Sequence, residues 1–325
     1  SDLYLHKHEI DANYDGLILQ IVWEYDADVF MKNNEAIPTL ELKNFVDTSI
    51  LSNYNTLFYQ QQQWIPCESQ ILSVDDFLIG NWLERLYFER LEQKSVLIKE
   101  LLLQSNTNFE AVLFKLLAKN FGLKINGEAF LELAKSIDFS ILRKVRFNEN
   151  ELMALLFGQA GFLEEDKEEI YHQNLKNTYQ YLQHKYKLQP ISKNLFQFFR
   201  MRPNNFPTIR IAQFVSLYFT HQNLFSKLMM ISEKEDFYDL FHFNIHDFWQ
   251  THYTFEKVSK KSSKKMTKSF IDLVVLNTII PLKFVYLKHR NELNEEAFLN
   301  LIKQLQPEKN SIISKFSYLK GVLVA

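Results

Sequence analysis

The stretch that decides the fold spans residues 200–214 and reads Arg-Met-Arg-Pro-Asn-Asn-Phe-Pro-Thr-Ile-Arg-Ile-Ala-Gln-Phe. Its two prolines, Pro203 and Pro207, lack a backbone N–H and bias the preceding residue toward extended conformations, so no single helix can run through them. The stretch therefore predicts a rigid corner. Thr208 is placed to cap a helix that begins near Ile209 and continues to residue 221.

Three guanidinium groups meet at this corner, those of Arg200, Arg202 and Arg210. They are candidates for anion binding, because guanidinium groups form bidentate hydrogen bonds to phosphate or carboxylate and the prolines would hold them in place. The alternative is an internal clamp, in which the arginines cap carbonyls or pair with acids. We favour the clamp and expect a carboxylate partner for Arg202, since Phe206 and Ile209 would draw the corner toward the core.

Length and composition indicate a folded protein with one large core or two modest ones, since 46% of the 325 residues are hydrophobic. The formal net charge of -2 means that any polyanion site must be local. The single cysteine, Cys67, is compatible with a reducing cytosol, so we expect a cytoplasmic protein. No apolar run reaches the roughly 18–20 residues of a membrane span. Residues 270–286 are interrupted by polar residues and predict a buried helix, with no membrane partner.

Helical periodicity and scarce glycine dominate the chain after about residue 72. The expected fold class is mainly α, a helical array with a small N-terminal β element, α+β overall. We expect residues 1–72 to form the small β-containing region, as part of a larger N-terminal domain or alone, and residues 73–325 to form the helical domain. The predicted helices cover residues 73–104, 109–120, 127–137, 149–157, 167–187, 209–221, 224–230, 236–241, 268–287 and 294–305.

The β element is predicted from two short segments near the start of the chain. Residues 17–25 are rich in β-branched and aromatic side chains, and residues 38–43 alternate apolar and polar. Asn33 and Asn34 provide a turn signal between them. Because this connection is too short for an ordinary helical crossover, we predict that the two strands pair, in antiparallel orientation.

Two groups of histidines have ligand-type spacing. His6, His8 and Asp11 are close enough in sequence to converge on a divalent metal, and the alternative is an exposed loop with no ligand. His242 and His246 would lie one turn apart on a helix, but the acid of a metalloprotease motif is absent between them. The surrounding aromatic residues favour packing for the second pair.

The residues from 257 to 268 contain six lysines separated mainly by serines. Such a run can contact phosphates with salt-sensitive affinity, although a mobile, solvated loop between helices is the more common case. Gly158 and Gly161 have helical flanks and therefore predict a close helix contact or tight connection instead of a phosphate loop.

Four segments carry a resemblance to a known family. They are Ser1-Asp2 with His6, His8, Asp11 and Tyr14 ahead of residues 17–24; Ile-Pro-Thr-Leu-Glu-Leu at 37–42; Leu-Phe-Gly-Gln-Ala-Gly-Phe-Leu at 156–163; and residues 200–213. With these segments the chain resembles, over almost its whole length, an uncharacterised bacterial family, the domain-of-unknown-function family numbered 2851. Members of that family extend further at both ends. Their upstream part resembles the acidic half-sites of metal-dependent nucleases of the restriction-endonuclease type.

Two function hypotheses follow. The first is a soluble helical binding or scaffold protein that uses the corner as a clamp or an anion site. The second, implied by the resemblance, is part of a metal-dependent, nuclease-like protein that binds nucleic acid or another polyanion and whose catalytic acids lie upstream of this chain. His6, His8 and Asp11 would then border a divalent-metal site.

Overall fold

The computed structural model describes residues 2–6, 8–31, 34–59, 64–65, 67–305 and 311–320. The chain forms two compact units, Ser1–Ser73 and Val74–Ala325. This division falls one residue after the predicted boundary. The predicted fold class is confirmed, since the structure is mainly helical and has one small β element near the N-terminus.

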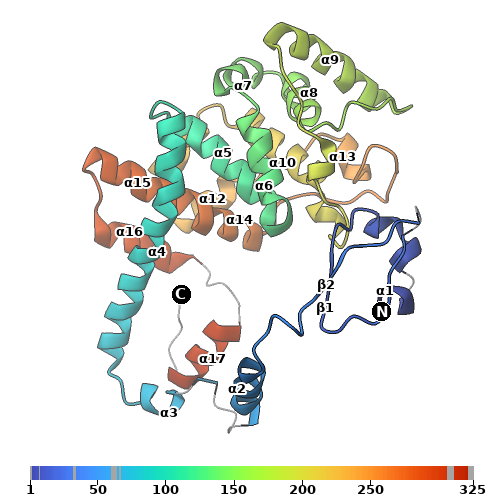
Figure 1. Cartoon of the computed structure of the whole chain (residues 1–325). Coiled ribbons are helices and arrows are strands. Elements are labelled where there is room, and N and C mark those ends of the chain that lie inside the picture. The colour runs from blue at the N-terminus through green and yellow to red at the C-terminus, as the bar shows by residue number, and fades with distance from the viewer. Residues whose placement is uncertain are drawn as a thin grey trace. The chain divides into compact units, whose positions relative to one another are not determined.

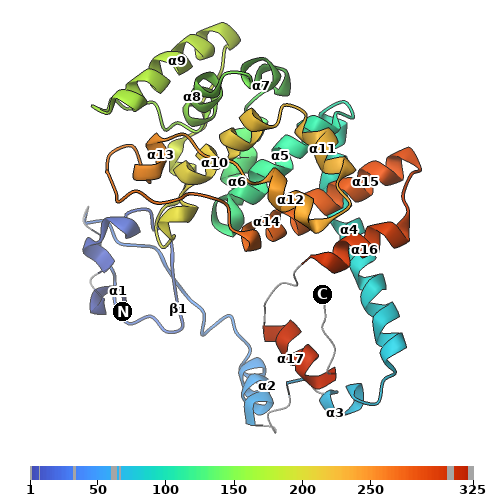
Figure 2. The ribbon, with the colours of Figure 1, turned by 180° about the vertical axis from the view of Figure 1, so that it is seen from behind.

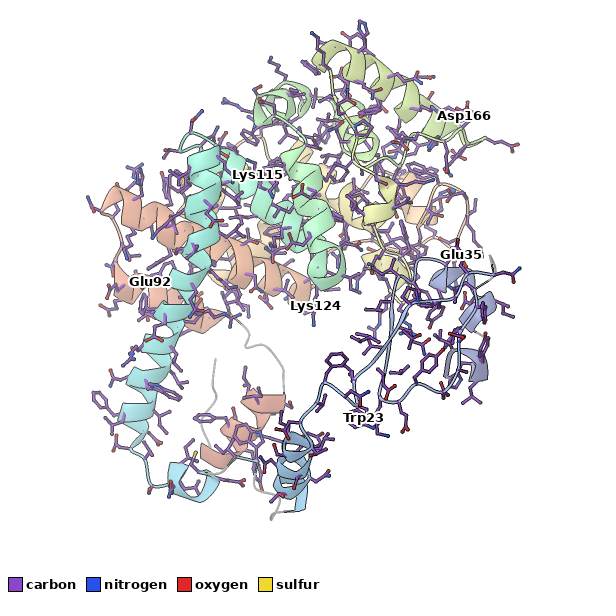
Figure 3. All side chains as sticks on the ribbon, in the orientation of Figure 1. Trp23, Glu35, Glu92, Lys115, Lys124 and Asp166 are labelled. Atoms are coloured by element: carbon purple, nitrogen blue, oxygen red, sulfur yellow. The ribbon has the colours of Figure 1, made fainter. Side chains whose placement is uncertain are left out.

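The first unit holds the β element and, within its described residues, five helical segments, of which α2 is the longest. Its elements are α1 (Asp2–Leu5), the 3-10 turns η1 (His8–Ile10) and η2 (Ala12–Tyr14), β1 (Gln20–Val22), β2 (Thr39–Glu41), α2 (Thr48–Tyr59) and α3 (Glu68–Ile71). Trp23, labelled in Figure 3, follows β1 and is exposed, as is Ile21 within the strand. The described residues therefore leave apolar side chains of this sheet uncovered.

The predicted strand pairing exists, but its predicted direction is wrong. β1 and β2 are parallel, with Ile21 opposite Leu40. The turn at Asn34, which has φ 60°, does not connect β1 directly to β2. It instead reverses the chain within the connection, where an antiparallel bridge joins Phe30 to Ala36. Because this turn reverses the chain once more before β2 begins, the second strand runs in the same direction as the first.

The second unit is an array of helices that pack mainly against their neighbours in sequence, as the pairs α5 with α6 and α8 with α9 show (Figure 1). Its elements are α4 (Asp76–Gln104), α5 (Phe109–Phe121), α6 (Leu123–Lys135), α7 (Phe139–Val145), α8 (Glu149–Gln159), α9 (Ile170–Tyr186), η3 (Lys193–Leu195), η4 (Pro203–Asn205), α10 (Pro207–Thr220), α11 (Leu224–Met230), α12 (Lys234–Leu240), α13 (Phe248–Thr251), α14 (Lys268–Val274), the π-helix η5 (Val275–Ile279), α15 (Ile280–Arg290), α16 (Glu295–Gln304) and α17 (Ser311–Lys320).

Helix α10 is the centre of this unit. Every residue from Pro207 to Tyr218 is buried, and the helix packs against both α8 and α5. A helix that is apolar on all sides belongs inside a core. Phe214 stacks on Phe114 of α5, with ring centroids 5.3 Å apart. The proline corner therefore leads the chain directly into the middle of the fold.

The helical stretch Lys268–Arg290 is long and apolar enough to cross a membrane by length and composition, in contrast to the sequence-based expectation. However, 72% of its most apolar window is buried inside the structure. Its position against α5 and α4 explains the apolar composition, because a helix enclosed by neighbours has no polar face to present. The expected buried helix is present.

The glycine pair after α8 supports a close contact between helices. A Cβ on Gly158 would lie 2.1 Å from ring carbons of Tyr179 on α9. Gly161 has φ +76°, and a Cβ there would lie 2.7 Å from the carbonyl oxygen of Ile191. The pair therefore positions α9 and the segment around residue 191 against α8, as the sequence predicted.

Candidate anion-binding site

In the corner before α10, the two prolines take the positions that the sequence predicts, whereas Thr208 does not. Pro203 begins the 3-10 turn η4 and Pro207 occupies the first turn of α10, where proline needs no N–H partner. Phe206 is the N-cap residue, with no side-chain cap. The prediction that Thr208 caps the helix is wrong, because its hydroxyl donates to the carbonyl oxygen of Tyr253 instead. The corner is thereby tied to the segment after α13.

Arg210 is the internal clamp of the corner. It is 6% exposed, and its guanidinium donates to Gln213 Oε1 at 2.9 Å and to Asn205 Oδ1 at 2.7 Å. The guanidinium carbon also lies 3.6 Å from the ring centroid of Phe270. Burial lowers the pKa of Arg210 to about 10. The partners are neutral amides, and no carboxylate in the described ranges lies within ion-pair distance, so the charge is held but not neutralised.

The other two arginines do not join Arg210. Arg200 is exposed, has φ 57° in the left-handed region, and lies over the ring of Phe199 at 5.1 Å. This backbone conformation is costly for a residue with a Cβ. Arg202 is exposed and forms no ion pair with any residue that the structure describes. The expectation of a carboxylate partner for Arg202 is therefore wrong, and the three predicted guanidinium groups do not converge.

Residues 257–268, here called the basic segment, are anchored to the fold along most of their length. Ser259 and Ser262 donate their backbone N–H groups to the carbonyl oxygens of Thr251 and Gln250, at 2.7 and 2.9 Å. Gln213 on α10 donates to the carbonyl oxygen of Lys264 at 2.7 Å. In Figure 2 the segment runs as an orange coil from α13 to α14. The expected mobile loop is therefore an ordered strap.

The lysines of the basic segment lack acidic partners. Lys257, Lys260, Lys261, Lys265 and Lys268 are exposed, and none of them forms an ion pair within the described part of the chain. Lysines elsewhere in the unit behave differently. Lys176, for example, is paired with Asp166 at 2.8 Å, the residue labelled at the edge of the unit in Figure 3. Positive charge on the basic segment is consequently free to act on a ligand.

Lys264 is the exception in exposure, because only 4% of it is accessible. Its ammonium nitrogen lies 3.6 Å from the ring centroid of Tyr253 and donates to Ser262 Oγ. Hydrogen bonds with Ser262 and then with Lys264 hold the pKa of the Tyr253 hydroxyl below its ordinary value. A buried ammonium group is costly unless its charge is compensated. Within the described residues, Lys264 has an aromatic face and a hydroxyl as partners, and no carboxylate.

A pocket of about 290 Å³ lies beside these lysines. Its wall includes Lys261, Lys264 and Lys265 together with the hydroxyl groups of Ser262 and Ser263. Ammonium and hydroxyl groups are donors that match the oxygens of a phosphate. The arrangement can bind an anion, and it presents no paired general acid and base.

The predicted metal ligands do not form a complete set. The rings of His6 and His8 are 5.6 Å apart, and His8 stacks on Tyr14 at 4.3 Å. Asp11 accepts hydrogen bonds from the backbone and side chain of Asn13, as in a local turn. No group of three or more histidine, cysteine, aspartate or glutamate residues that could hold a metal occurs among the described residues. The metal site remains a prediction.

The second histidine pair is not helical, so its predicted one-turn spacing is wrong. His242 and His246 lie between α12 and α13. His246 stacks on Tyr171 at 4.7 Å, which is the aromatic packing that was expected. His242 Nε2 lies 3.3 Å from the ammonium of Lys265, so this histidine borders the basic segment.

Sequence reasoning missed two residues that shape this site, Tyr253 and Gln213. Tyr253 supports the ammonium group of Lys264, and Gln213 joins that segment to Arg210 through its two amide atoms. The usable signal was the polar Gln213 on a mostly apolar helix, since a buried amide needs partners on both its oxygen and its nitrogen. The identity of those partners depends on the tertiary fold.

The comparison with known families agrees with the resemblance in the sequence. Residues 1–311 match the family described as protein of unknown function (DUF2851). The chain belongs to this family. The match includes the corner, the basic segment and the glycine pair, so all three lie within the family's common region. No curated protein and no solved structure matches the chain. The family description names no activity, so function must be argued from the site.

Proposed function

We propose that the larger unit binds a phosphate-bearing polyanion at the basic segment, and that the protein acts as a binding protein. The observation that carries this proposal is the ordered strap of six lysines, none of which is paired with a carboxylate among the described residues. Surface lysines commonly have acidic residues nearby that balance their charge. A cluster of lysines without such acids, on a backbone anchored to the fold, favours the binding of a negatively charged ligand. A cytoplasmic setting is part of the proposal.

The chemistry favours repeated phosphate groups over a single carboxylate. Lysines along an ordered segment present a row of point charges, and each can contact a different phosphate of an extended chain. Lys264 adds a partly enclosed position, because this residue lines the pocket while its ammonium lies against the ring of Tyr253. A phosphate oxygen there would supply the compensating charge that the fold itself lacks.

The proposal is tested by replacing two pocket lysines, Lys261→Gln and Lys265→Gln, in one variant of the full chain. The matched control carries Lys288→Gln and Lys303→Gln, because these exposed lysines are paired with Glu92 and Glu84. Both variants change the net charge equally. Binding of a labelled single-stranded oligodeoxynucleotide is measured by fluorescence anisotropy over a range of salt concentrations.

We expect the pocket variant to bind more weakly and to show a shallower salt dependence. For a single strand, each lost phosphate contact lowers the slope of log affinity against log salt by about 0.7, so two lost contacts lower it by about 1.4. The control should keep the original slope. Equal losses in the two variants would show that binding follows net charge alone, and would refute a site at the basic segment.

A further inference from the structure

A second pocket, of about 360 Å³, lies beside the corner, and four phenylalanines are among its lining residues. Phe162, Phe198, Phe206 and Phe255 contribute its apolar wall. Phe198 and Phe206 are half-buried, with ring centroids 5.2 Å apart in an edge-to-face arrangement. Such a wall offers ring faces to a planar ligand.

The rim of this aromatic pocket is polar and carries both donors and acceptors. Lys167 pairs with Glu165 and Glu256, and Lys193 pairs with Glu165. All four of these residues line the pocket. Because the two lysines are paired with the two glutamates, the rim has no excess positive charge to attract a simple anion. It suits a ligand whose edge has both hydrogen-bond donors and acceptors.

Tyr253 connects the aromatic pocket with the lysine pocket through contacts with one lining residue of each. The ring of Phe206, in the wall of the aromatic pocket, is 6.4 Å from that of Tyr253. Tyr253 in turn lies 3.6 Å from the ammonium of Lys264, in the wall of the lysine pocket. Thr208 lines the aromatic pocket and donates to the carbonyl oxygen of Tyr253. Tyr253 therefore contacts one lining residue of each pocket, and a ligand that occupies both would have to span this tyrosine.

We propose that the aromatic pocket receives one unstacked base of a single-stranded nucleic acid whose phosphates lie on the basic segment. This inference rests on the proposed function and specifies the ligand class. A nucleobase combines a planar face with donors and acceptors on its edge, and it is attached to phosphates by a short sugar linkage. A simple polyphosphate has no apolar surface to place against this wall, and an acyl chain has no polar edge for the charged rim.

The first test compares two single strands of equal length and phosphate number on the unaltered full chain, one with bases and one abasic. Stacking of one base on aromatic side chains corresponds to roughly a five- to hundredfold change in affinity. We expect the base-bearing strand to bind more tightly by at least about fivefold. Equal affinity for the two strands would overturn the inference and leave the polyanion site standing. Failure of both strands to bind would overturn the inference together with the proposed function.

The second test asks whether the base binds in the aromatic pocket. Phe206→Leu keeps an apolar side chain and removes one ring face, and Phe225→Leu is the control, because Phe225 is also half-buried but packs against Tyr286. We expect Phe206→Leu to reduce the preference for the base-bearing strand without changing the affinity for the abasic strand. An unchanged preference in a variant whose melting temperature shows that it is folded would contradict the assignment.

Glu256→Gln at the rim provides a variant with little risk to folding, since the Glu256 side chain is 56% exposed. The change replaces an acceptor by an amide and should alter the ranking of strands that differ only in their base. If the rim does not read the base edge, the ranking will not change, and the proposed orientation of the base is then wrong.

Discussion

The sharpest stability prediction concerns Arg210, which the structure places in the role that the sequence analysis gave to Arg202. Replacing Arg210 by alanine removes two hydrogen bonds from a charged donor, worth about 1.5–3 kcal/mol each. It also removes a desolvated cation–π contact with Phe270, worth about 2 kcal/mol. These losses come to about 5–8 kcal/mol.

Removing the buried charge recovers part of this loss. Burial lowers the pKa of Arg210 from 12.5 to about 10. At about 1.36 kcal/mol for each tenfold change in the proton dissociation constant, this lowering corresponds to roughly 3 kcal/mol of desolvation penalty. The net destabilisation expected for Arg210→Ala is therefore about 2–5 kcal/mol.

The assay is urea denaturation of Arg210→Ala beside Arg202→Ala and the unaltered chain. Arg202 is exposed, so its replacement should change the free energy of unfolding by no more than about 0.5 kcal/mol. Arg210→Lys keeps the positive charge, but an ammonium group lacks the planar fork that reaches both Asn205 and Gln213. Its loss of unfolding free energy should therefore lie between the losses for Arg202→Ala and Arg210→Ala. Equal effects of Arg202→Ala and Arg210→Ala would refute the division into an internal and a surface arginine.

Two further predictions test the packing and the buried histidine. Gly158→Ala should lower the free energy of unfolding by about 1–3 kcal/mol, because its Cβ would meet the ring of Tyr179, whereas Gly80→Ala, with nothing within 4 Å, should be neutral or stabilising in thermal melts. Burial lowers the pKa of His172 below 6.5, so the unfolded chain binds a proton first as the pH falls. Stability should be highest above about pH 6.5 and decrease below it, and His172→Gln should reduce that decrease in urea titrations at pH 7 and pH 5.

The helices of the larger unit were predictable because their signals are local. Asn108 directly precedes the predicted helix 109–120 and caps α5, with its side chain accepting from the N–H of Ala111 at 3.1 Å. Pro203 and Pro207 likewise set the corner through restrictions on their own backbone. Caps, prolines and 3.6-residue periodicity involve residues a few positions apart, so one sequence contains the information.

The strand direction was not predictable in the same way. A turn signal at Asn34 shows that the chain reverses, but not which two segments the reversal brings together. Here the turn pairs Phe30 with Ala36, and β2 comes later. The relative direction of two strands depends on the number of chain reversals between them, so every turn in the connection must be known. A single missed turn changes the predicted pairing from parallel to antiparallel.

The candidate site was predictable in its charges and not in its geometry. Sequence alone identified the three arginines and the six lysines, because charge and spacing are visible there. It could not show that Lys264 would be buried over Tyr253 while Lys261 and Lys265 stay exposed. That difference depends on a bond from Gln213, 51 residues away, to the backbone of Lys264.

Gln213 connects the two buried cations of the site, and this connection bears on how a ligand would act. Its amide oxygen accepts from Arg210, while its amide nitrogen donates to the carbonyl oxygen of Lys264. Both cations are therefore held in the interior by neutral groups, at a cost that ion pairing would have reduced. A phosphate at Lys264 would reduce that cost only in the folded chain, because the unfolded chain has no such pocket. Binding and folding stability are thus coupled, and a polyanion that occupies the pocket must raise the melting temperature as its concentration exceeds its dissociation constant.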